Sequence, residues 1–142
     1  MGISVRGLII YIESVLLIKR RKKGQLYYVL PGGHLEDKEE YQEACIREVY
    51  EETGLRVNCN KKLFSQKESD SHTTIYYLCS IKDIESILKD DKGLPFVELK
   101  GEEIRRNCDE DSYKPLWMSI KKIKKLTIYP IKIKGVINKH SK

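Results

Sequence analysis

The sequence predicts a mixed α+β fold, within the broad α/β class, from two observations. Several short segments rich in Ile, Val and Tyr alternate or run apolar, which is typical of β-strands. One stretch, from residue 37 to residue 54, contains no proline, reaches its first glycine at Gly54, and has helix-capping residues at both ends. A chain of 142 residues can bury one core unaided, so we expect a single domain over residues 1–142.

The predicted strands are the segments richest in β-branched and aromatic residues. They are residues 3–12, 14–19, 25–30, 56–64 and 73–81, with 94–99 as a further candidate. The basic stretch from Lys19 to Gly24 is interpreted as an exposed turn. The tripeptide Pro31-Gly32-Gly33 should end the strand before it, because proline cannot donate to a sheet and glycine takes unusual backbone angles.

The stretch after these glycines predicts a helix of about four turns. Asp37 is the expected N-cap, with Glu40 three residues later as in a capping box. Gly54 is the expected C-cap.

Three segments outside this helix are less regular. Residues 84–92 are polar and fit either a loop or a short helix. Ser119 precedes Ile120, Ile123 and Leu126 at helical spacing, which predicts a short amphipathic helix that ends before Pro130. Residues 131–134 alternate like a strand, but a helix started by the proline is equally allowed.

Composition excludes several classes of protein. The chain is 40% apolar and 34% charged, and it has no apolar run near the roughly 20 residues that a membrane span needs. The N-terminus fits a strand better than a signal peptide, so we expect no membrane and a cytoplasmic location. The spacing of the cysteines matches neither a zinc pair nor a disulfide framework, so we expect reduced thiols at Cys45, Cys59, Cys79 and Cys108.

Charge is distributed unevenly along the chain. All 21 acidic residues lie at or before Asp111, whereas residues 112–142 hold nine lysines and no acid. Such a basic segment fits either a solvated lysine-rich face or a patch that binds nucleic acid or an acidic membrane.

Three glutamates crowd one face of the predicted helix. At about 100° per residue, Glu48, Glu51 and Glu52 fall within a narrow arc. Like charges at these spacings destabilise a helix. Arg47 can pair with Glu51 at i+4, but one cation does not neutralise three acids. A glutamate-rich solvated helix remains an alternative, but a bound hard divalent ion would compensate the cluster.

The spacing around the glutamates decides between these alternatives. Gly33 is followed after five residues by Glu39, and after seven more by Arg47, Glu48 and Val49; Glu51, Glu52, Gly54 and Leu55 complete the pattern. Residues 33–55 thus resemble the complete Nudix box of the Nudix hydrolase family. The resemblance implies a Nudix-type sandwich, with a mixed β-sheet between helices.

The resemblance also assigns roles to the matching positions. It implies that the metal, Mg²⁺ or Mn²⁺, is held by Gly33 through its carbonyl and by Glu48, Glu51 and Glu52. It implies that Arg47 orients the glutamates and that Glu39 braces the helix. The general base in the family is either a glutamate of the box or one from an outside loop, for which Glu103 is our choice, with Glu102 next.

Substrate recognition is less well encoded. Arg6, Tyr28 and Trp117 are our candidates for substrate binding, because a guanidinium can meet phosphates and an aromatic ring can stack on a base. The family marks for ADP-ribose and diadenosine polyphosphate hydrolysis fall at Asp70 and His72, so neither substrate is supported.

The function expected from this resemblance is a metal-dependent pyrophosphohydrolase. It would cleave a nucleoside diphosphate linked to another moiety into a nucleoside monophosphate and a phosphorylated product. The alternative is a Nudix-fold binding module that uses the basic C-terminal segment on nucleic acid or a protein partner. A homodimer is compatible with either function.

Overall fold

The computed structural model describes residues 2–98 and 112–141, and its contacts divide the chain into two compact units. The first unit comprises Met1–Ile9 and Pro31–Ile87, and the second comprises Ile10–Leu30 and Leu88–Lys142. The sequence predicts a single domain and gives no indication of two units.

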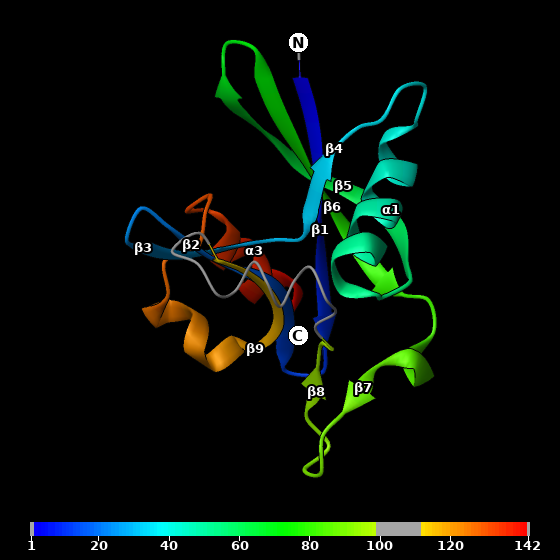
Figure 1. The fold of residues 1–142 in the computed structure, drawn as a ribbon, viewed down its shortest axis with the longest axis vertical. Helices are drawn as coiled ribbons and strands as arrows, with labels where there is room; N and C mark the ends of the chain where they lie inside the picture. The colour runs from blue at the N-terminus through cyan, green and yellow to red at the C-terminus, as the bar shows by residue number, and fades with distance from the viewer. Residues whose placement is uncertain (1, 99–111, 142) are drawn as a thin grey trace. The chain divides into compact units, whose positions relative to one another are not determined.

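The first unit is built on a mixed sheet. Its strands are β1 (Gly2–Tyr11, which ends in the second unit), β4 (Gly32–His34), β5 (Val57–Ser69) and β6 (His72–Ile81). β1 pairs in parallel with β6 and antiparallel with β4, and β6 pairs antiparallel with β5 (Figure 1). The apolar run of β1 is buried, as expected for a strand with a parallel neighbour.

These strands confirm the predictions for residues 3–12, 56–64 and 73–81, although β5 continues five residues beyond its predicted end. The predicted end of the strand before Pro31 is confirmed, because β3 ends at Val29, but the short strand β4 over Gly32 and Gly33 was not predicted. An added Cβ on Gly32 would lie 2.0 Å from the Val5 carbonyl oxygen, so glycine allows β4 to approach β1 this closely.

Helix α1 (Tyr41–Thr53) packs on β4 and β5. It ends as predicted at Gly54, whose φ of 75° is left-handed and whose N–H donates to the Tyr50 carbonyl at 2.8 Å. The predicted start at Asp37 was wrong: Lys38 has a φ of 63°, which a right-handed helix cannot contain. The N-cap is instead Glu40, whose N–H donates to the Glu43 carboxylate at 3.2 Å.

The second unit has a sheet centred on β2. Its strands are β2 (Ser14–Lys22), β3 (Gln25–Val29) and β9 (Ser112–Ser119), with a separate pair formed by β7 (Leu88–Lys89) and β8 (Pro95–Phe96). β2 pairs antiparallel with both β3 and β9. The predicted turn over Lys19–Gly24 is shorter than expected, because β2 continues through Lys22, and β9 was not predicted at all.

The remaining helices are short. The 3-10 helix η1 (Ile84–Ser86) belongs to the first unit, and η2 (Ile120–Lys125) lies where an amphipathic helix was predicted. α3 (Ile133–His140) shows that the segment after Pro130 is helical. Ile133 and Ile137, four residues apart, form its buried face.

The mixed α+β class predicted from the sequence is therefore confirmed. Across residues 2–98 and 112–141, no helix combines the length and the apolar character needed to cross a bilayer.

Candidate functional site

The glycine of β4 and a glutamate of α1 meet at very short range. A Cβ built on Gly33 would lie 2.5 Å from Glu48 Oε2 and 2.6 Å from Glu48 Cδ. Any side chain at position 33 would therefore displace the Glu48 carboxylate or the strand. Glycine here brings a backbone segment and a carboxylate together, which is what a shared ligand requires.

Glu52 joins the same strand to the helix one turn later. Its Oε1 accepts the Gly32 N–H at 2.7 Å. This hydrogen bond from the backbone fixes the orientation of the Glu52 carboxylate. α1 thus contributes Glu48 and Glu52 to the side of the helix that faces β4.

Arg47 lies among the carboxylates of this region. Its Nε and Nη2 donate to the two Glu39 oxygens at 2.7 and 2.9 Å, and Nη1 donates to Glu48 at 2.9 Å and to Glu51 at 2.8 Å. Nη2 also donates to the His34 carbonyl at 3.1 Å. One planar guanidinium therefore links α1, the turn before it and the end of β4.

These hydrogen bonds shift the pKa values of Glu39 and Arg47 in opposite directions. Hydrogen bonds from Arg47, together with the Glu36 backbone N–H, hold the pKa of Glu39 below its ordinary value. Hydrogen bonds to Glu39 and Glu48 raise the pKa of Arg47, although its burial opposes the shift. Both groups are ionised near neutral pH.

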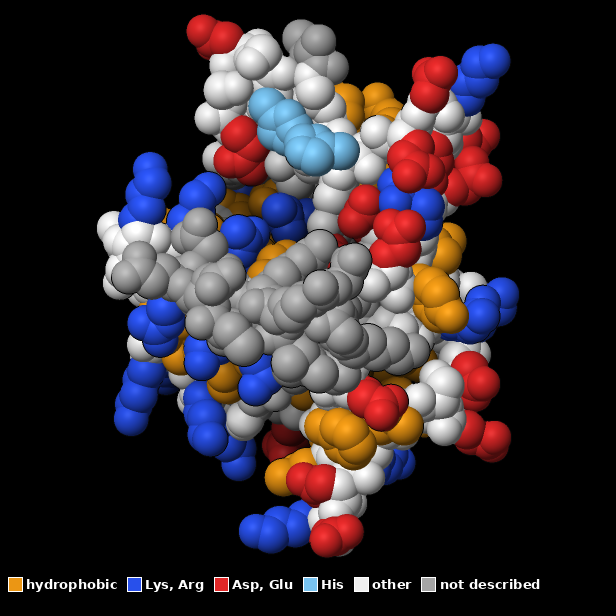
Figure 2. All heavy atoms as spheres, viewed as in Figure 1, with side chains coloured by type: hydrophobic (Ala, Val, Ile, Leu, Met, Phe, Trp, Pro, Cys, Tyr) orange, Lys and Arg blue, Asp and Glu red, His pale blue; other side chains and the backbone are white. Residues whose placement is uncertain are grey.

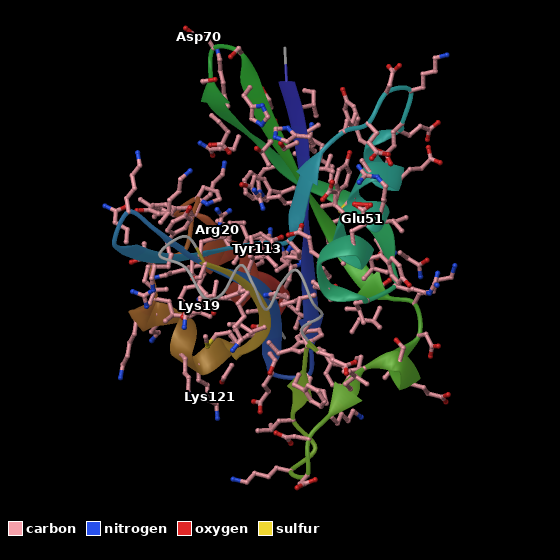
Figure 3. All side chains as sticks on the ribbon, in the orientation of Figure 1. Lys19, Arg20, Glu51, Asp70, Tyr113 and Lys121 are labelled. Carbon is pink, nitrogen blue, oxygen red and sulfur yellow. The ribbon has the colours of Figure 1, made fainter. Side chains whose placement is uncertain are left out.

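The site keeps an excess of negative charge. Arg47 is shared by Glu39, Glu48 and Glu51, and Figure 2 shows many carboxylates with few cations over the α1 side of this face. The side chain of Glu48 is 18% exposed, whereas that of Glu51, labelled in Figure 3, is 54% exposed. Carboxylate and carbonyl oxygens suit hard divalent cations, so Glu48, Glu51, Glu52 and the Gly33 carbonyl could hold one.

The other predicted site residues are distributed over both units. Arg6 lies in β1 of the first unit, opposite Gly32 of β4. Tyr28 and Trp117 belong to the second unit. Tyr28 is only 7% exposed, and the Trp117 ring lies 6.0 Å from that of Tyr11. Glu103 and Glu102 lie outside the described residues.

Sequence reasoning missed one polar cluster beside the box. The Ser4 hydroxyl lies 3.2 Å from His34 Nδ1 and 2.9 Å from His72 Nε2, and the two imidazole rings are 5.3 Å apart. The histidines are 38 residues apart in sequence and meet only because β4 and β6 flank β1. No local pattern indicates such a pairing.

The basic C-terminal segment places lysines on the outside of η2. Lys121 (Figure 3) and its three neighbouring lysines in η2 are exposed, whereas Ile123 is buried. This arrangement fits both interpretations of the segment, the solvated face and the binding patch.

Known proteins resemble this chain over most of its length. A human diphosphoinositol polyphosphate phosphohydrolase is 36% identical over 74 residues, which are 51% of this chain and 40% of that protein. YtkD of Bacillus subtilis (strain 168), a candidate 8-oxo-dGTP diphosphatase, is 32% identical over 119 residues, 84% of this chain and 70% of that protein. The chain spans less than half the length of the diphosphoinositol relatives.

Solved structures share the fold. A NUDIX-family hydrolase from Clostridium perfringens aligns with a TM-score of 0.65 and 20% identity, covering 97% of this chain and 94% of that one. The NUDIX domain family itself matches residues 2–137. The chain therefore belongs to the NUDIX domain family.

Proposed function

We propose that this protein is a metal-dependent pyrophosphohydrolase. Its substrate would be a nucleoside diphosphate linked to another moiety, and its products a nucleoside monophosphate and a phosphorylated compound. The observation that carries the proposal is the contact of Gly33 with Glu48, because only a glycine lets the β4 backbone and this carboxylate converge. A solvated glutamate-rich helix would not need that contact.

The donor set fits a hard divalent cation. Glu48, Glu51 and Glu52 would hold Mg²⁺ or Mn²⁺ by their carboxylates, and Gly33 would add its carbonyl oxygen. When bound, the ion would neutralise the diphosphate and make a water molecule more acidic. Glu51, the most exposed of the three glutamates, is the one with most freedom to reorient on binding.

Arg47 would act as a positioning residue. Its bidentate pair with Glu39 fixes the guanidinium, and the guanidinium in turn holds Glu48 and Glu51. The candidates for the general base are Glu51 or Glu52 of the box and Glu103 outside the box, with Glu102 as the next choice. Arg6, Tyr28 and Trp117 are proposed to contact the substrate.

The two relatives support a diphosphate substrate. One is named for a diphosphoinositol polyphosphate and the other for 8-oxo-dGTP, and both compounds contain a phosphoanhydride bond. The family match runs through both compact units, which supports the further proposal that residues 1–142 form one domain.

The test is a substrate panel of nucleoside triphosphates, nucleotide sugars and dinucleotides, assayed with and without Mg²⁺ or Mn²⁺. We expect a nucleoside monophosphate from at least one compound, only when the metal is present. Failure to turn over any member would contradict the enzyme proposal. Salt-sensitive binding of nucleic acid by the inactive protein would then favour the binding module instead.

A further inference from the structure

Three cysteines far apart in sequence meet inside the first unit. Cys45 of α1, Cys59 of β5 and Cys79 of β6 have sulfur atoms that all lie within 4.8 Å of one another. The sulfurs of Cys45 and Cys79 are 3.8 Å apart. All three are free thiols. Cys45 lies within residues 33–55 but is not one of the defined positions of the box, and none of the three cysteines is among the proposed ligands of the hard cation.

The fold itself explains the convergence. Cys59 and Cys79 are direct partners across the antiparallel β5–β6 pair, so their side chains lie on the same face of the sheet. Cys45 is one of three residues that α1 buries, together with Ala44 and Val49. The helix therefore places its thiol over the two strand thiols.

A glycine on the neighbouring strand leaves space for the sulfur atoms. A Cβ built on Gly7 of β1 would lie 3.0 Å from Cys79 Sγ and 3.2 Å from Cys45 Sγ. Any larger residue at this position would push those two sulfurs away. Gly7 lies in the extended interior of a strand, where glycine weakens the strand unless something must approach closely.

Burial and acidity differ among the three thiols. Cys45 is fully buried and Cys79 is 5% exposed, whereas Cys59 is half-buried and offers a route from solvent. Hydrogen bonds from the Cys45 and Cys79 thiols lower the pKa of Cys59. The pKa of Cys45 is raised, mainly by its hydrogen bond with Cys59 and further by its hydrogen bond with Cys79 and by burial. The hydrogen bonds within the cluster therefore favour ionisation of Cys59, the thiol nearest to solvent.

We propose that Cys45, Cys59 and Cys79 form a binding site for one soft d¹⁰ cation, Zn²⁺ or Cu⁺. Thiolates select these ions, whereas the oxygen ligands of the box select hard ones. With metal–sulfur bonds of about 2.3 Å, three sulfurs around one ion lie roughly 4 Å apart, so this cluster needs shifts of less than about 1 Å. Each cysteine that ligates as a thiolate would give up its thiol proton, and the bound ion would cross-link α1 to the β5–β6 pair.

The two cations would complete the site differently. Zn²⁺ prefers four ligands, so a solvent molecule would enter beside the half-buried Cys59. Three thiolates alone suffice for Cu⁺. Competition with chelators specific for each ion, under anaerobic conditions for Cu⁺, distinguishes the two.

The direct experiment uses Co²⁺ as a spectroscopic substitute for Zn²⁺ in the reduced full chain. We expect a sulfur-to-cobalt charge-transfer band that saturates at one ion per chain and is abolished by excess Zn²⁺ or Cu⁺. Cobalt bound by the box carboxylates has no sulfur ligand and gives no such band. The Glu52→Gln protein should therefore keep the band, which separates this site from the proposed hydrolase.

Variants locate the site. Cys59→Ser, at the half-buried position, should lose the band and weaken Zn²⁺ or Cu⁺ binding at least about 10-fold, while its circular dichroism spectrum remains that of the folded protein. Gly7→Ala should weaken binding with all cysteines present. The matched control is Cys108→Ser, which leaves the three thiols intact. A band that survives Cys59→Ser, the absence of any band, or equal loss in Cys108→Ser would overturn the proposal.

Discussion

Gly33 and Glu48 lie so close together that a methyl group on the glycine would come within 2.5 Å of the Glu48 carboxylate. The two residues are 15 positions apart in the sequence and belong to different elements, β4 and α1. A glycine at this position is thus a geometric requirement of the site rather than of the strand. Its replacement tests the geometry without removing a charge.

Gly33→Ala should reduce turnover of the identified substrate by about 10²-fold, because displacement of Glu48 by about 1 Å is enough to misplace the catalytic groups. Steady-state kinetics at saturating Mg²⁺ measures the effect. Gly135→Ala in α3 is the matched control, since a Cβ there meets nothing within 4 Å. Equal activities for the two variants would show that the close contact has no role in catalysis.

Arg47→Lys should lower turnover by about 10- to 100-fold while the protein stays folded. A lysine keeps the positive charge but cannot make the bidentate pair with Glu39 and still reach Glu48 and Glu51. The apparent Mg²⁺ affinity should fall as well, because the glutamates lose their fixed orientation. An unchanged Mg²⁺ dependence would argue against a positioning role for this guanidinium.

The Glu39–Arg47 pair should make stability depend on pH. The pKa of Glu39 is lowered in the folded protein by its hydrogen bonds from Arg47 and the Glu36 backbone. The stability that ionised Glu39 contributes is therefore present above its unfolded pKa of 4.5 and is lost as the pH falls through its folded pKa. Urea unfolding from pH 7 to pH 3 should show a steeper loss for the native protein than for Glu39→Gln. Parallel curves for both proteins would contradict this linkage.

The sequence was informative where a local rule controls the backbone or the spacing of side chains. The end of α1 at Gly54 follows from the left-handed C-cap, and the box from Gly33 to Leu55 follows from fixed spacing. The start of α1 was missed because two successive pairs of residues fit a capping box, Asp37 with Glu40 and Glu40 with Glu43. The positive φ of Lys38 excludes a helix that starts at Asp37, so the helix starts after Glu40.

Long-range pairings could not be predicted from spacing. Cys59 and Cys79 are partners only through the β5–β6 register, which itself shifts just after Cys59. The Ser4 contacts with His34 and His72 likewise depend on which strands flank β1. β9 was missed because it includes Pro115, and proline argues against an interior strand. Among the described strands β9 pairs only with β2, so it is an edge strand, where proline is tolerated.

If residues 1–142 form one domain, unfolding should be a single cooperative transition. Trp117 is the only tryptophan of the chain and reports on the second unit, whereas far-UV circular dichroism also follows α1 of the first unit. The two signals should give the same urea midpoint. Separate midpoints would show that the two compact units unfold independently.

The box carboxylates of α1 are proposed to support a metal-dependent hydrolysis. Its most direct test is the steady-state turnover of Glu52→Gln with Mg²⁺, measured beside Glu85→Gln, the same change at an exposed position on η1. Glu52→Gln keeps the side-chain shape but removes an anionic ligand, so turnover should fall by at least about 10²-fold, whereas Glu85→Gln should match the native protein. Native turnover by a correctly folded Glu52→Gln protein would show that this carboxylate has no part in hydrolysis.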